Sequence, residues 1–189
     1  DLAPLLGEAE QEAADEAAAV ASLLARADAL AEEFADRYEG KVAELDGSGL
    51  KAAMESLAEI SDLVGRAGSY AQLRFSADTE DPAVGALMQS FRERATALNT
   101  KLLFFELEWV ELDDARAEQL LAADGLDFCR HHLELERRYR PHLLSKPEEV
   151  IATEMSVTGA GAWSRLFDEL TSAIRVEVDD EPGGAPLDV

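Results

Sequence analysis

Three long stretches of the chain place apolar residues at alternating intervals of three and four, which is the period of one face of an α-helix. They run from about Glu8 to Tyr38, from about Gly49 to Phe75, and from Pro82 to Leu112. Their apolar stripes are Ala13, Ala17, Val20, Leu24, Ala27, Ala31, Phe34 and Tyr38; then Leu50, Ala53, Leu57, Ile60, Val64, Ala67 and Ala71; then Val84, Met88, Phe91, Ala95, Leu98, Leu102, Phe105, Trp109 and Leu112. Because such a stripe is narrow, each helix is expected to pack along another helix at a shallow angle.

Short links join the three predicted helices, which favours antiparallel neighbours. Asp81 and Pro82 mark the start of the third helix, since an N-cap acceptor is followed by a proline at the first helical position. A long coiled coil is the competing interpretation, but the glycine-containing breaks favour a bundle. Residues 1–112 are therefore predicted to form an antiparallel bundle of three long helices.

Shorter helices are predicted over residues 113–173, packed on the bundle as part of the same domain. Asp113-Asp114 starts one helix, Asp124-Gly125 interrupts it, and another runs from about Leu126 to Arg138 before Pro141 breaks the chain.

The last predicted helices follow a local start signal. Ser145 and Glu148 have the spacing of a capping box, which predicts a helix reaching about Val157. Gly159 and Gly161 then predict a turn, and a final helix carries Trp163, Leu166, Phe167, Leu170 and Ala173.

Residues 174–189 change pattern. Ile174 to Val178 alternate apolar and polar side chains, as a strand does, and a turn-rich stretch precedes Pro186-Leu187-Asp188-Val189. We predict a truncated β-hairpin here, which needs a further part of the protein to lie against. The predicted fold class is all-α: an antiparallel bundle of long helices, shorter helices following, and a small C-terminal β-hairpin.

Composition narrows the function classes. Apolar residues make up 47% of the chain, and 40 Asp and Glu against 17 Lys and Arg give a net charge of -23. This charge argues against nucleic acid and anionic membranes as partners. A single cysteine and the lack of a long apolar run or signal peptide predict a soluble, cytoplasmic protein. The first residue is Asp1 and the last pattern is unfinished, so we expect a segment of a longer protein.

The acidity has two open explanations. A surface poor in lysine and rich in acidic residues is expected in a cytoplasm high in salt, where screening relieves self-repulsion. A GC-rich genome would also favour Ala and Arg. Stability measured against KCl separates the two, because a salt-adapted domain loses stability in dilute buffer.

Three histidines, His131, His132 and His142, are the first candidates for chemistry. None has a Glu three residues before it, as a di-iron bundle requires, and no His-Glu-x-x-His motif is present. His131 with Glu134, or His132 with Glu136, fit ordinary surface pairs at helical spacing.

Other chemical side chains also have a structural interpretation. Cys129 is predicted to be a core residue, and Trp109 and Trp163 fall on apolar stripes and are predicted to be core as well. The cluster of Arg137, Arg138 and Arg140 fits pairing with acidic helices, although it could instead receive a carboxylate from a substrate or partner. Gly159-Ala160-Gly161 is a weak anion-binding signal that a tight turn explains equally well. No catalytic, cofactor-binding or metal-binding residue is predicted in this chain.

Several stretches resemble the N-terminal region of the oligoendopeptidase F family of zinc metallopeptidases, which are relatives of thimet oligopeptidase. The resemblance covers nearly the whole chain in order. The stretches are Asp1 to Leu5, Leu63 to Ala71, Asp78 to Pro82, Arg94 to Leu98, Leu103 to Glu106, Tyr139 to Ser145, Glu154 to Gly159, Ala162-Trp163 and Leu166 to Leu170.

The resemblance implies a parent enzyme that hydrolyses short peptides with zinc held by a His-Glu-x-x-His helix and a downstream Glu. It implies that this segment is a non-catalytic helical wall of the substrate channel. The zinc motif would lie in the missing C-terminal domain, so the segment itself is expected to need no cofactor, and once isolated it could self-associate. The alternative is a free-standing acidic helical module for protein interaction; a ferritin-like metal bundle is disfavoured by the missing ligand pairs.

Overall fold

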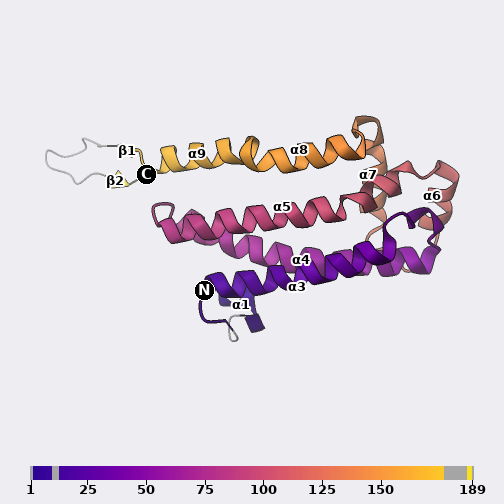
Figure 1. The fold of residues 1–189 in the computed structure, drawn as a ribbon, viewed down its shortest axis with the longest axis horizontal. Helices are drawn as coiled ribbons and strands as arrows, with labels where there is room; N and C mark the ends of the chain where they lie inside the picture. Colours follow the sequence, from indigo (N-terminus) through magenta and orange to yellow (C-terminus); the bar gives the residue numbers. More distant parts are fainter. Residues whose placement is uncertain (1, 10–12, 177–186, 189) are drawn as a thin grey trace.

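A computed structural model describes residues 2–9, 13–176 and 187–188, and these lie almost entirely in helices, which confirms the predicted all-α class (Figure 1). The helices are α1 (Ala3–Leu6), α3 (Glu16–Tyr38), α4 (Gly47–Ala77), α5 (Pro82–Glu111), α6 (Asp114–Leu121), α7 (Arg130–Tyr139), α8 (Lys146–Thr158) and α9 (Ala160–Ser172), with 3-10 turns η1 (Val42–Glu44) and η2 (Arg140–His142). No helix among the described residues is sufficiently long and apolar to span a membrane.

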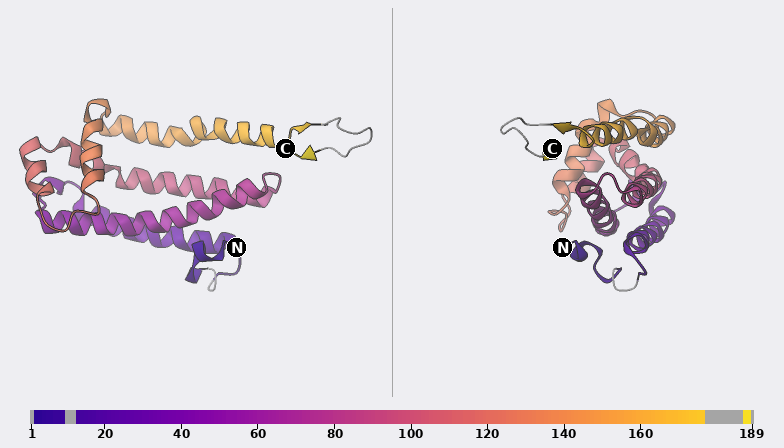
Figure 2. Two further views of the ribbon diagram at one scale, coloured as in Figure 1. Left: turned by 180° about the vertical axis from the view of Figure 1, so that it is seen from behind. Right: turned by 90° about the vertical axis from the view of Figure 1, so that its left-hand side faces the viewer.

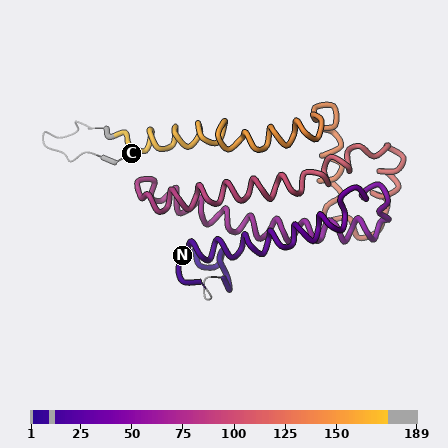
Figure 3. Tube along the Cα trace, in the orientation of Figure 1, coloured from indigo at the N-terminus to yellow at the C-terminus, as the bar shows by residue number. Residues whose placement is uncertain are grey.

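Helices α3, α4 and α5 lie side by side, each antiparallel to the next along the chain (Figures 1 and 2). The chain then turns through α6 and α7 at one end of this bundle, as its path in Figure 3 shows. It returns as α8 followed by α9, which run in nearly one direction, antiparallel to α5. Helix α8 packs against α5, so it joins the bundle as a fourth, outer element.

Small residues let the three long helices approach closely. Ala27 and Ala31 of α3 and Ala53 and Ala67 of α4 are fully buried. At the end of the bundle near α6 the core changes to a cluster of rings: Phe34 lies 4.8 Å from Tyr38, 5.9 Å from Phe104 and 5.3 Å from Phe105, between ring centroids. Apolar burial of this kind stabilises by about 25 cal/mol per Å², so this seam supplies most of the fold's cohesion.

Aspartate side chains start half of the described α-helices, namely α3, α4, α5 and α6. Asp46, Asp81 and Asp113 each accept a backbone N–H of the first helical turn, at 2.7, 2.8 and 2.9 Å. The predicted starts at Asp81 and Asp113 are therefore confirmed. Helix α8 begins with the predicted capping box of Ser145 and Glu148. These starts depend on local hydrogen bonds, which is why the sequence alone locates them.

The first long helix begins later than predicted, at Glu16 and not at Glu8. Asp15 accepts the N–H of Ala18 at 2.8 Å and takes the N-cap position. Upstream, α1 ends at Gly7, whose φ of +59° favours glycine. The Arg66 Nε of α4 donates to Leu5 O at 2.9 Å, which holds α1 against the bundle. Ala17 of the predicted stripe is consequently exposed, and Ala19 and Leu23 are buried in addition.

The helix predicted from Leu126 starts at Arg130. Residues 126–129 instead make a tight turn in which Leu126 O accepts from the N–H groups of Cys129 (3.0 Å) and Arg130 (2.7 Å). The Leu126 side chain is fully buried in this turn. Burial of that one side chain outweighs the helical preference of the segment, a tertiary effect that local propensity does not report.

The described part of the chain does not show the full β-hairpin predicted over residues 174–189. Ile174, the first residue of its predicted strand, follows α9 in a turn and donates its backbone N–H to Thr171 O (3.2 Å). Only Arg175–Val176 (β1) and Leu187–Asp188 (β2) pair, antiparallel, with Arg175 opposite Asp188. The predicted turn and Val189 lie outside the described residues.

Candidate functional site

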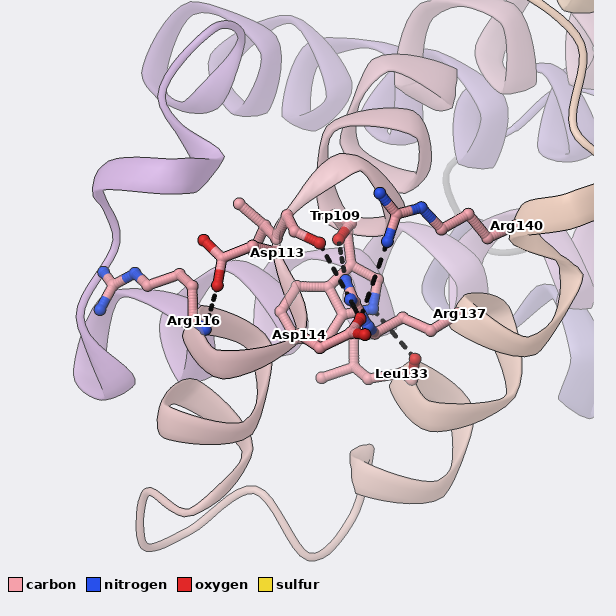
Figure 4. Close-up of polar contacts among 8 residues, drawn as sticks. Trp109, Asp113, Asp114, Arg116, Leu133, Arg137 and Arg140 are labelled. Atoms are coloured by element: carbon pink, nitrogen blue, oxygen red, sulfur yellow. Dashed lines mark hydrogen bonds and ion pairs between the residues drawn. The ribbon is translucent and has the colours of Figure 1, made fainter.

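Arg137 of α7 is bound to the end of α5 and the start of α6 (Figure 4). Its Nη1 donates to Trp109 O (3.0 Å), and its Nη2 donates to Leu112 O (2.9 Å) and to Asp114 Oδ1 (2.6 Å). The guanidinium carbon also lies 5.7 Å from the ring centroid of Trp109. Trp109 is fully buried and donates its indole N–H to Leu133 O at 3.0 Å. A cation at the carbonyl end of a helix is electrostatically favourable.

These contacts decide between the two predicted roles of the arginine cluster. Arg137 and Arg140 both lie near Asp114 Oδ1, at 2.6 and 3.7 Å, as the pairing interpretation predicts. The Arg137 side chain is only 12% exposed, so its donors are committed to the protein. Arg138 is exposed. The cluster joins α5, α6 and α7, and its buried member does not present itself to a ligand.

The three histidines are not brought together. His131 and His142 are exposed. His132 lies 2.9 Å from Glu136 Oε1 through its Nε2, one helical turn away on α7. This is the predicted pair, but it is no ordinary surface pair, because the Glu136 side chain is only 18% exposed.

Glu136 and His132 line a partly open cavity of about 400 Å³ between α4, α5, α7 and α8. Its walls are partly apolar, through Met54 and Leu57 of α4, Leu102, Leu103 and Phe105 of α5, and Phe128 and Cys129 of the turn before α7. Ser61 of α4, Asn99 of α5 and Thr153 of α8 add polar side chains. A second carboxylate, Glu106 of α5, also lines it, and none of the described lining residues is a lysine or arginine.

Both glutamates of this cavity have a raised pKa. Burial, together with the neighbouring charge of Glu106, raises the pKa of Glu136 to about 7. Burial and then the charge of Glu149 raise the pKa of Glu106, and His132 lowers it in part. Both shifts arise because a low-dielectric site with too little positive charge disfavours a second carboxylate. Such perturbed groups in a cavity are typical of binding or proton-transfer sites.

Cys129 behaves as the predicted core residue. It is 5% exposed, and its Sγ donates to Leu126 O at 3.5 Å. Burial raises the pKa of its thiol. A protonated thiol is a poor nucleophile, so its position in the cavity wall contributes packing and not chemistry.

The described residues do not fit the zinc ion that the family resemblance implies for the parent enzyme. No group of three or more His, Cys, Asp and Glu side chains within residues 2–9, 13–176 and 187–188 is placed to hold a metal ion. Zinc needs three or four converging N, O or S ligands, whereas here His132 faces Glu136 and the other two histidines lie apart on the surface. No reaction step is derived through zinc.

Helices α8 and α9 expose a long apolar face. Neither helix, each described along its whole length, contains a buried residue. Trp163, predicted as core, is 71% exposed, although α9 contacts α5 elsewhere, where Arg165 Nη1 donates to Gln89 Oε1 at 3.3 Å. The other large exposed apolar side chains of these helices and the residues just after them are Ile151, Met155, Leu166, Phe167, Leu170 and Ile174. Large exposed apolar side chains gathered on one segment are typical of an interaction surface.

The turn predicted at Gly159 and Gly161 is confirmed at Gly159, which alone separates α8 from α9, whereas Gly161 already lies in α9. Its N–H donates to Met155 O (2.8 Å), and its own carbonyl accepts from Trp163 N (3.2 Å). A Cβ at Gly159 would stand 2.8 Å from Met155 O. The glycine is therefore required by a near-continuous helix junction, and the anion-binding interpretation has no further support.

Sequence reasoning missed Glu106 and with it the cavity. A signal was present: Glu106 interrupts the apolar run Leu102-Leu103-Phe104-Phe105 and follows Leu102 by one helical turn, on the same face. What the sequence does not indicate is that α7 brings Glu136 to this face.

Comparison with known families identifies one match. The family model described as Oligopeptidase F, an N-terminal peptidase domain, matches residues 108–175, from the last turn of α5 to the end of α9. This match confirms the predicted resemblance over that segment, which is a little over a third of the chain. No curated protein and no solved structure matches the chain.

Proposed function

From this resemblance we propose that the chain is the N-terminal, non-catalytic helical domain of an oligoendopeptidase F-like zinc metallopeptidase that hydrolyses short peptides. In this proposal the helices form one wall of the substrate channel, and the zinc site lies in a C-terminal catalytic domain. The family match over residues 108–175 is the observation that carries the proposal.

The exposed face of α8 and α9 supports the proposal. Trp163, Phe167 and Leu170 of α9 and Ile174 just after it recur at intervals of four and three and are 71%, 66%, 62% and 53% exposed. These positions share one side of the helix. The face lies within the segment that matches the family, so the partner domain that covers it would be one that the family has in common.

The proposal divides the chain by role. Residues 1–112 would form the long-helix bundle, residues 113–173 would pack on it in the same domain, and residues 174–189 would lead to the catalytic domain. A cytoplasmic location fits the single, buried cysteine. The isolated segment would associate with itself through the α8–α9 face.

The alternative, a free-standing acidic module for protein interaction, rests on the same exposed face and the net charge of -23. Reading the gene beyond the codon for Val189 separates the two proposals. The peptidase proposal requires that the frame continue into a His-Glu-x-x-His helix. A stop codon without such a motif would refute it.

Comparing the full-length protein with residues 1–189 alone tests whether catalysis belongs to the C-terminal domain. We expect the full-length product to bind one zinc ion and to cleave short fluorogenic peptides, and residues 1–189 alone to do neither. In the full-length protein, Trp163→Asp should reduce activity by disturbing the domain contact, whereas Glu134→Gln, a charge change on α7, should leave it unchanged. Zinc-dependent hydrolysis by residues 1–189 alone would contradict the non-catalytic role.

A further inference from the structure

The cavity between α4, α5, α7 and α8 is lined by two carboxylates, Glu106 and Glu136, and by no lysine or arginine among the described residues. Among the described residues Glu136 pairs only with His132, at 2.9 Å, and no ion pair of Glu106 with a lysine or arginine is present. Two partly buried carboxylates and one imidazole thus line a partly open cavity. Carboxylates withdrawn from water are favoured by a full cationic partner.

The residues that line the cavity indicate which kind of cation it can bind. A bare metal ion would need three or more ligands in reach, and the described residues do not provide them. The cavity is instead roomy, at about 400 Å³, and is lined by Leu57, Leu102, Phe105 and Phe128. Pockets of this size with apolar walls and a few converging polar groups bind small organic molecules.

We propose that this cavity binds an organic cation with an apolar body, with its ammonium or guanidinium group between Glu106 and Glu136 and its body against Leu57, Leu102 and Phe128. Protonation of Glu136 competes with binding of the cation. Phe128, a lining residue that is 55% exposed, supplies apolar surface on the solvent side of the cavity. The inference does not depend on the proposed peptidase role.

Binding is expected to strengthen as pH rises. A cation prefers ionised carboxylates, and Glu136 has a pKa of about 7. Below that pH each bound cation must displace one proton, so the affinity falls by up to tenfold per pH unit. The other charged groups facing the site act in the same sense or stay constant: His132 repels the ligand when it is protonated, and Glu106 and Glu149 attract it when they are ionised.

The test uses isothermal titration calorimetry of the full chain with 2-phenylethylammonium, and with 2-phenylethanol as a neutral ligand of the same shape. We expect the ammonium to bind at least tenfold more tightly than the alcohol at pH 8. Glu106→Gln and Glu136→Gln should each raise Kd at least tenfold. Glu111→Gln on α5 and Glu134→Gln on α7 carry the same charge change outside the cavity and should change Kd less than twofold.

A second arm distinguishes a free amine from a peptide terminus, which share this chemistry. If the peptide Phe-Gly-Gly binds more tightly than 2-phenylethylammonium and the N-acetylated peptide does not bind, the site is assigned to peptide N-termini. If 2-phenylethylammonium binds more tightly than the peptide, the site is assigned to free amines. Both support the proposal. Three results would overturn it. The first is equal affinity for the ammonium and the alcohol, and the second is no effect of either cavity variant while circular dichroism shows native helix content. The third is binding of Zn²⁺ or Mg²⁺ through the same glutamates without binding of the ammonium.

Discussion

The three-helix bundle and the α8–α9 pair have the same kind of amphipathic pattern, but the apolar side is buried in the bundle and exposed on α8 and α9. In α3, α4 and α5 the apolar stripe is buried between helices of the same chain, and fully buried alanines let these helices approach closely. In α9 the stripe of Trp163, Phe167 and Leu170 faces outward. Periodicity therefore shows that a helix needs a partner, but not whether that partner lies within the same chain.

The two tryptophans give the largest test of this contrast. Trp109→Ala should lower the free energy of unfolding by about 3–5 kcal/mol, because it removes a fully buried ring and leaves a cavity. Trp163→Ala should change it by less than about 0.5 kcal/mol, as expected for a surface position. Urea unfolding followed by far-UV circular dichroism measures both.

Fluorescence checks the same contrast independently, since these are the only 2 tryptophans in the sequence. The Trp109→Ala variant should emit as a water-exposed indole and the Trp163→Ala variant as a buried one. A loss above about 2 kcal/mol for Trp163→Ala, well outside the surface range, would show that the α9 face is covered even in the isolated chain.

The arginine cluster gives the next largest effect. Arg137→Ala leaves the carbonyl groups of Trp109 and Leu112 and the carboxylate of Asp114 without this donor. We expect a loss of about 2–3 kcal/mol, since unsatisfied groups in a part-buried site are costly. Arg138→Ala, on the exposed side of the same helix, serves as the control and should cost less than about 0.5 kcal/mol. Similar losses for the two variants would indicate that Arg137 does not join α5, α6 and α7.

Glu136, which packs against the bundle, and Glu148 on α8 are expected to make stability depend on pH in opposite directions. Glu136 has a pKa of about 7 in the folded chain, against an ordinary 4.5. Its contribution to stability is therefore complete below pH 4.5 and is lost as pH rises to about 7, by up to about 2–3 kcal/mol. Exposed Glu148 has the opposite sign: hydrogen bonds from Ser145 lower its pKa, so its contribution is lost only as pH falls through that lowered value.

Urea titrations at several pH values between 4.5 and 7 test this expectation. Glu136→Gln should flatten the decline in stability across that range, and Glu134→Gln should retain it. If Glu136→Gln retains the full slope, another group is responsible for it.

Two glycines of α4 give the smallest and most local comparison. A Cβ at Gly68 would meet the Phe91 ring at 2.5 Å, whereas a Cβ at Gly65 meets nothing within 4 Å. Gly65→Ala should stabilise by about 0.5–1 kcal/mol through helix propensity. Gly68→Ala should forfeit that gain, because Phe91 must move away from the α4–α5 contact. Thermal unfolding of the pair measures the difference, and equal stabilisation would mean that Phe91 moves at no cost.

The candidate site shows where prediction from sequence ended. His132 and Glu136 are one helical turn apart, so their pairing could be predicted from spacing. Glu106 lies 30 positions before Glu136 on a different helix, and no local pattern relates the two. In the same way the position of Arg137 on a helix was predictable, whereas its contacts to the end of α5 depend on how α7 packs.

The sequence by itself determined where α5, α6 and α8 begin and which side of the long helices is apolar, because caps and helical periodicity involve residues only a few positions apart. Asp81, Asp113 and the Ser145–Glu148 box fixed those starts through hydrogen bonds within one turn. Only the tertiary structure decided which apolar stripes are covered, and that Glu106 and Glu136 line the same cavity. Burial and the pKa of a buried carboxyl depend on residues brought together from distant helices, and their energies exceed the local preferences that a sequence reveals.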